Sequence, residues 1–142
     1  MIDDNYVLAF KQLTEIAVKA MSPGINDPGT ALNAIDYLSE LFSIRLLKSD
    51  YSYTKIEDVA WVNITSVNFS TLLYQVMASL RTYCKRDISV VQNLIKMLQF
   101  LKEIAQKNTH KEAIDKELEL LKGDINSSIT NKEDLKFLNE LF

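Results

Sequence analysis

The stretch Ser22-Pro23-Gly24-Ile25-Asn26-Asp27-Pro28-Gly29-Thr30 holds both prolines of this chain and two of its three glycines. The residue before a proline is pushed out of the α region, so a helix that precedes this stretch must end near Pro23. A second helix can begin at Pro28, because the N–H that proline lacks has no partner in the first turn of a helix. The stretch therefore predicts two helices joined by a short loop.

The loop itself has a defined expected conformation. Proline at the second position and glycine at the third predict a type II turn over residues 22–25. Asp27 then precedes Pro28 as the N-cap of the second helix. Asn26 adds a polar side chain that this cap does not need, which favours a functional role. Two interpretations stay open, a structural turn and a contact with a ligand or partner.

Apolar residues recur at helical spacing on both sides of the loop. They predict helices over 3–21, 28–48, 69–85, 88–106 and 109–129, and a short last helix with Leu135, Leu138 and Leu141. Gly123 lies inside the fifth helix and predicts a kink or an early end there. The expected caps are Asp3, Asn68 and Asp87, with capping boxes at Thr109/Glu112 and Thr130/Glu133.

The segment 49–67 breaks the helical pattern and is rich in β-branched and aromatic residues, which favours an extended connection or two short strands. Its aromatic residues Tyr51, Tyr53 and Trp61 either cover the helices or face another chain. The fold class expected is all-α: a compact bundle of five to six helices in a single domain over 1–142, with an extended or β-hairpin excursion around 50–66.

Composition limits the function classes. The formal net charge of −3 argues against a nucleic-acid partner. We see no secretory signal and no apolar run of about 18 residues, so we expect a soluble chain. Cys84 is the single cysteine, which indicates a reducing compartment.

The side chains that usually carry catalysis are few. His110 is the one histidine and is expected on the surface at a helix start, so we predict no metal site and no cofactor. Cys84 lies on an apolar helical stripe and is interpreted as a core residue. No nucleophile elbow or phosphate-binding motif occurs, so we predict that this chain is not an enzyme.

The basic cluster Arg81, Lys85 and Arg86 is interpreted as a solvated helix end, with an anion site as the alternative. If the third helix passes the loop, Arg81 can pair with Asp27 or with a ligand carboxylate. The candidate ligand- or partner-binding residues are Ser22, Pro23, Gly24, Asn26, Asp27, Thr30, Arg81 and Tyr83.

The stretch from Phe10 to Ala31 resembles the signature of a bacterial family of predicted membrane proteins, domain of unknown function 2254, whose members carry a similar helix followed by a Ser-Pro-Gly-Ile-Asn-Asp-Pro loop. A second, looser match consists of Phe69, Leu80, Arg81, Tyr83 and Asp87. The sequence departs from the family at Gly29, where threonine is more frequent. The resemblance extends from about Phe10 to Ala105.

The resemblance implies a larger protein with an N-terminal block of membrane helices, of which this chain is the C-terminal soluble helical part. It implies localisation at the cell membrane, with this domain on the cytoplasmic side. The first function expected is therefore a non-catalytic assembly or regulatory domain, whose partners are the membrane-embedded part of its own full-length chain and a homo-oligomer. The alternative is a module that binds a small ligand or ion at the loop 22–30.

Overall fold

The computed structural model describes residues 2–48, 51–56, 60–65 and 68–142. It contains six helices and one hairpin, which confirms the all-α class with a short excursion. The elements in chain order are α1 (Ile2–Ala20), α2 (Pro28–Leu46), β1 (Tyr51–Ile56), β2 (Ala60–Thr65), α3 (Phe69–Cys84), α4 (Ile88–Ile104), α5 (Asn108–Ser128) and α6 (Lys132–Asn139).

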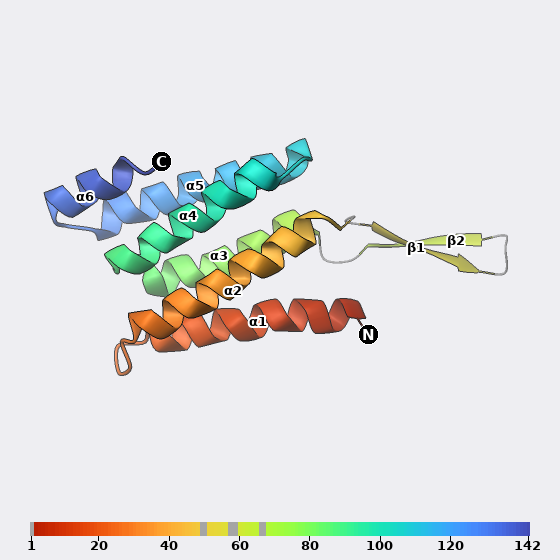
Figure 1. Cartoon of the computed structure of the whole chain (residues 1–142), viewed down its shortest axis with the longest axis horizontal. Helices are drawn as coiled ribbons and strands as arrows, with labels where there is room; N and C mark the ends of the chain where they lie inside the picture. Colours follow the sequence, from red (N-terminus) through yellow and green to blue (C-terminus); the bar gives the residue numbers. More distant parts are fainter. Residues whose placement is uncertain (1, 49–50, 57–59, 66–67) are drawn as a thin grey trace.

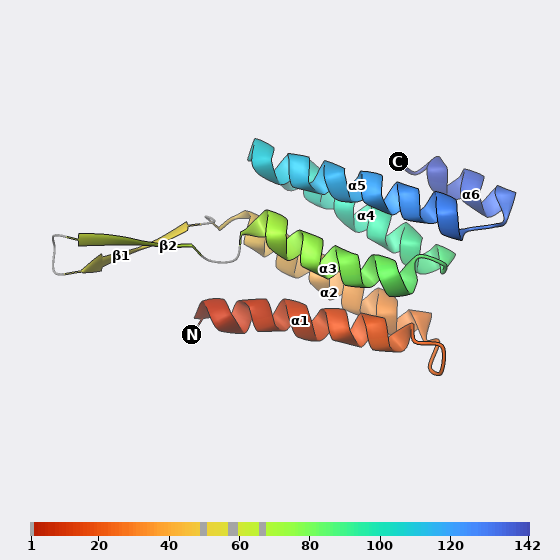
Figure 2. The same cartoon turned by 180° about the vertical axis from the view of Figure 1, so that it is seen from behind.

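The five long helices form a ring around the core (Figures 1 and 2). Around this ring α1 packs on α2, α2 on α4, α4 on α5, α5 on α3 and α3 again on α1. The short helix α6 lies outside the ring against α5 and α4. Each long helix thus has two neighbours within the ring, and its apolar stripe faces inward.

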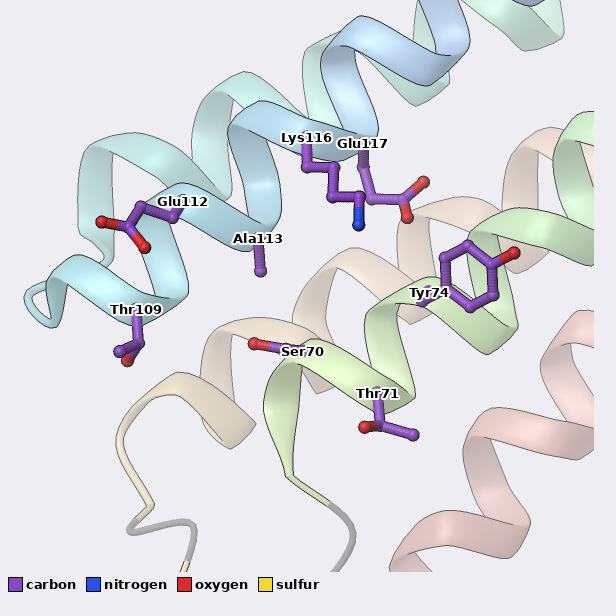
Figure 3. Close-up of a pocket in the computed structure, with 8 residues that line it drawn as sticks. All are labelled: Ser70, Thr71, Tyr74, Thr109, Glu112, Ala113, Lys116 and Glu117. Atoms are coloured by element: carbon purple, nitrogen blue, oxygen red, sulfur yellow. The ribbon is translucent and has the colours of Figure 1, made fainter.

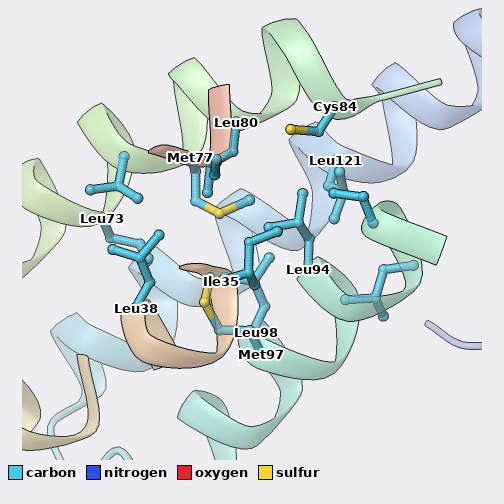
Figure 4. Packing of buried hydrophobic residues seen from close by; sticks show 14 of the residues in the cluster. Ile35, Leu38, Leu73, Met77, Leu80, Cys84, Leu94, Met97, Leu98 and Leu121 are labelled. Atoms are coloured by element: carbon cyan, nitrogen blue, oxygen red, sulfur yellow. The ribbon is translucent and has the colours of Figure 1, made fainter. Parts of the chain in front are cut away.

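Aromatic rings link four of these helices through the core. The ring centroids of Phe10 and Phe42 are 4.5 Å apart, those of Phe42 and Phe69 are 6.0 Å apart, and those of Phe69 and His110 are 4.7 Å apart. Aliphatic side chains and the thiol of Cys84 fill the rest of the core (Figure 4). His110 is 1% exposed, so its expected place on the surface is wrong.

The helix boundaries correct several expected caps. α1 begins at Ile2, so Asp3 lies within the helix. α5 begins at Asn108 and includes Thr109, so the capping box proposed there is wrong. α6 is capped by Asn131, which accepts hydrogen bonds from the N–H groups of Glu133 and Asp134, and not by Thr130. Several polar residues compete at these helix starts, and sequence alone does not choose among them.

Two expected caps are confirmed, and one expected helix end is not. Asn68 caps α3 through the N–H of Thr71, and Asp87 caps α4 through the N–H of Val90. α5 runs through Gly123 to Ser128, so the early end expected at this glycine is wrong.

The hairpin of β1 and β2 projects beyond one end of the helices, and the loop between α1 and α2 lies at the opposite end (Figure 1). The two strands are antiparallel, with Tyr51 opposite Thr65 and Ile56 opposite Ala60. The side chains of Tyr51, Tyr53 and Trp61 lie outside the described residues, so their two interpretations stay predictions.

Candidate functional site

The loop between α1 and α2 is closed by main-chain hydrogen bonds. The N–H groups of Ile25 and Asn26 both donate to the carbonyl oxygen of Ser22, at 3.0 and 2.9 Å. The N–H of Asp27 donates to the carbonyl oxygen of Ala20 at 2.6 Å. The loop therefore folds back on the last turn of α1.

The expected type II turn is wrong. Such a turn needs a positive φ at its third residue, here Gly24, but no glycine of the described residues has one. The positive φ falls on Asn26, at 45°. Asparagine tolerates the left-handed region better than most residues, so the backbone accounts for the presence of Asn26.

Asp27 caps α2 as predicted. One carboxylate oxygen accepts from the N–H of Thr30 at 3.2 Å and the other from the Thr30 hydroxyl at 2.5 Å. The hydrogen bond from the Thr30 hydroxyl lowers the pKa of Asp27 most, and the hydrogen bond from the Thr30 N–H lowers it further. Desolvation opposes this shift but is smaller. Pro28 occupies the first turn. Asp27 and Thr30 thus have a structural role.

A surface pocket of about 390 Å³ joins this loop to the turn between α3 and α4. It brings together three of the predicted site residues, Pro23, Asn26 and Tyr83. The other lining residues are Met21, Thr82, Lys85, Arg86 and Asp87. Ser22, Gly24, Asp27 and Thr30 do not line it. We call this surface the loop pocket.

Arg81 does not reach the loop. Its Nη1 atom lies 3.0 Å from Oδ2 of Asp124 and its Nε atom lies 3.4 Å from Oε2 of Glu117. Both carboxylates belong to α5, so the expected pair with Asp27 and the interpretation of Arg81 as part of a solvated helix end are wrong. Arg81 instead ties α3 to α5 inside the bundle.

Glu117 is the polar residue that the sequence interpretation missed. Its side chain is 3% exposed. Burial raises its pKa, and the attraction of Arg81 only partly offsets this effect. The helical spacing in the sequence could have predicted its burial, because Glu117 lies three residues after Ile114 and four before Leu121, on the buried stripe of α5. The alternating lysine and glutamate residues of this helix are also typical of a solvated face, so the two patterns compete.

A second pocket, of about 520 Å³, lies between α3 and α5 (Figure 3). Glu117 forms part of its wall, and its carboxyl group points from α5 toward α3, which contributes Tyr74 to the same pocket. The other lining residues are Ser70, Thr71, Thr109, Glu112, Ala113 and Lys116. We call this surface the α3–α5 pocket.

The two residues most able to supply a nucleophile or base are inside the core. Burial, with a smaller contribution from Asp87, raises the pKa of Cys84 to about 12, so this thiol is a poor nucleophile. His110 is packed against Phe69. Among the described residues, no three His, Cys, Asp or Glu side chains are placed to hold a metal ion.

The comparisons with known proteins concern the first two thirds of the chain. Residues 1–100 match the family described as "Predicted membrane protein (DUF2254)". Over 100 residues the chain is 33% identical to "Uncharacterized protein Mb1321c" of Mycobacterium bovis and to "Uncharacterized protein Rv1290c" of Mycobacterium tuberculosis. Each match covers 68% of this chain and 18% of the relative. No solved structure matches the chain.

Proposed function

Because the chain belongs to the DUF2254 family of predicted membrane proteins, we propose that it is the non-catalytic helical part of a larger membrane protein and serves its assembly or regulation. The proposal is supported by the extent of the match, which covers only 18% of each mycobacterial relative. Within the residues that the structure describes, no helix is both long and apolar enough to cross a membrane. We assign the membrane-embedded portion to the remainder of such a protein.

The absence of catalysis is part of this proposal. Enzymes that use nucleophilic or acid–base catalysis need a cysteine, histidine or comparable group within reach of a substrate. Here Cys84 and His110 are both buried among core side chains. We also propose the cytoplasmic side of the membrane, in keeping with a single cysteine that has no partner within this chain.

The loop pocket is the surface through which we propose that assembly occurs. Ile25 is 55% exposed beside it and Tyr83 is 54% exposed within it. Arg86 adds an exposed guanidinium at the same place. Tyrosine and arginine are enriched in the residues that dominate binding at protein interfaces. The partner proposed is a second copy of the chain, with the membrane-embedded part of its own protein as a further contact.

The experiment compares the mass of the chain in solution with that of a variant carrying Ile25→Ser and Tyr83→Ser. Both side chains are exposed, so their replacement leaves the core intact. Tyr37→Ser is the matched control, because Tyr37 is 60% exposed on α2 and does not line the loop pocket. The proposal expects the loop variant alone to lower the mass.

A small anion in the loop pocket is the second candidate function. Lys85, Arg86, Asn26 and Tyr83 offer hydrogen-bond donors around a volume of about 390 Å³. Inorganic phosphate is the probe: 10 mM phosphate should raise the melting temperature of the wild type but not of Arg86→Gln, at constant ionic strength. An equal response of both proteins, or no response, would reject this candidate.

A further inference from the structure

The α3–α5 pocket is separate from the loop pocket and lies toward the other end of the helices. It is lined by the first turns of α3 and the first half of α5, whereas the loop pocket uses the last turn of α3. Its volume of about 520 Å³ lies within the usual range of small-molecule sites. The function proposed above does not use it.

The buried carboxylate in its wall is only partly compensated. One guanidinium, Arg81, serves both Glu117 and Asp124, and its shorter contact, at 3.0 Å, is with Asp124. The Oε2 atom of Glu117 and the Nε atom of Arg81 form a buried ion pair 3.4 Å apart, with a geometry poorer than that of a well-aligned hydrogen bond. Buried charged groups normally have both an ion partner and well-aligned hydrogen bonds. The single guanidinium of Arg81 therefore compensates Glu117 only in part.

The remaining charges around the pocket leave it negative. Glu112 adds a second carboxylate to its lining and Lys116 adds one ammonium group. Arg81 and Asp124 do not line the pocket, but when this ion pair beside Glu117 is included, the group holds three carboxylates and two cations. Burial raises the pKa of Glu117, and the attraction of Arg81 and Lys116 lowers it by less. A positively charged ligand would supply the missing charge.

The exposed ring of Tyr74 on α3 and the carboxyl group of Glu117 on α5 line the same pocket (Figure 3). Tyr74 is 52% exposed, so its ring is open to a ligand. An aromatic face attracts organic cations, because the π-system carries negative charge on its faces. A carboxylate next to an aromatic ring is therefore a combination suited to an ammonium group.

We propose that the α3–α5 pocket binds a small organic ammonium ion, with the cation against Glu117 and its alkyl part against Tyr74. The hydroxyl groups of Ser70, Thr71 and Thr109 line the same pocket and can accept the remaining N–H groups. Lys116 opposes the ligand by charge repulsion. Removal of the Lys116 charge should therefore strengthen binding, whereas removal of the Glu117 charge should weaken it.

The test is a titration of the ¹⁵N-labelled chain with n-butylammonium chloride, followed by amide NMR spectra. The proposal expects saturable shifts of amides in residues 70–74 and 109–117. n-Butanol at the same concentration and KCl at the same ionic strength should not reproduce these shifts. The neutral alcohol has the same alkyl chain, so the comparison isolates the charge.

Three variants on α5 give the decisive comparison. Glu117→Gln should weaken binding about tenfold, because it removes the charge and keeps the shape. Lys116→Gln should strengthen binding by about threefold, since it removes a repulsive charge near the surface. Glu119→Gln is the matched control: it changes the net charge by the same amount on the same helix, outside the pocket, and should leave binding unchanged.

The outcomes are distinct. Equal binding by Glu117→Gln and the wild type, weaker binding by Lys116→Gln, or shifts that do not saturate would each overturn the proposal. If Glu117→Gln fails to give the spectrum of a folded protein, Tyr74→Leu replaces it, because this exposed position can change without loss of the core. Tyr74→Leu should also weaken binding, and unchanged affinity in that variant would overturn the proposal equally.

Discussion

The backbone N–H of Asp27 donates a 2.6 Å hydrogen bond to the carbonyl oxygen of Ala20. This bond joins the residue that caps α2 to the last residue of α1, so the loop is closed by its own main chain. Asn26 lies between the closing bonds with a φ of 45°. The conformation of the loop therefore depends on which residue can adopt that φ, and the residues of the loop that line the loop pocket form the surface that we propose for partners.

Asn26 is predicted to act through its backbone. Asn26→Ala should lower the free energy of unfolding by about 1 kcal/mol, because alanine pays a steric cost in the left-handed region. Asn26→Gly should lower it by less, since glycine enters this region without that cost. Urea unfolding of the three proteins measures both changes. An equal loss in the two variants would show that the asparagine side chain, rather than φ, stabilises the loop.

Gly123 is predicted to be a weak point of α5. A Cβ atom added there would meet no other atom within 4 Å, and its φ is not positive. Gly123→Ala should therefore raise the free energy of unfolding by about 1 kcal/mol through helix propensity. Thermal unfolding, with Glu119→Ala on the same helix as a control expected to change little, measures the gain. A loss of stability in Gly123→Ala would contradict this expectation.

Glu117 is predicted to make stability depend on pH. Burial raises its pKa in the folded chain, and the nearby carboxylate of Asp124 adds a smaller increase. The positive charges of Arg81 and Lys116 lower the pKa, but by less than burial raises it. The folded state thus binds this proton more tightly than the unfolded state, so the contribution of Glu117 to stability falls as the pH rises above about 4.5. Glu117→Gln removes this contribution.

The measurement is the difference in free energy of unfolding between Glu117→Gln and the wild type at several pH values from 4 to 8. The difference should shift in favour of the glutamine variant as the pH rises through this range. A difference that is constant, or that shifts in favour of the wild type, would show that Arg81 compensates the buried carboxylate fully.

Local sequence patterns predicted the helices well. The apolar residues that recur at helical spacing within 69–85 are buried in α3: Phe69, Leu72, Leu73, Val76, Leu80 and Cys84. The caps Asp27, Asn68 and Asp87 are also confirmed. These features depend on residues within one or two turns, so their spacing in the sequence is sufficient to identify them.

The candidate sites were less predictable, because they depend on contacts between distant segments. The meeting of Asn26 with Tyr83 follows from the packing of α1 against α3. The pairing of Arg81 with Asp124 joins residues 43 positions apart. An arginine near a helix end has the same local sequence whether it is solvated or ion-paired. Only the packed structure shows which of the two applies to Arg81.

The central claim, that the loop pocket is a surface for self-assembly, is tested most directly by light scattering on the purified chain over a range of concentrations. We expect the wild type and Tyr37→Ser to reach twice the mass of one 16.2 kDa chain, whereas the variant with Ile25→Ser and Tyr83→Ser should stay at the mass of one chain. A wild type that remains a monomer at every concentration, or a loop variant that assembles as the wild type does, would contradict it.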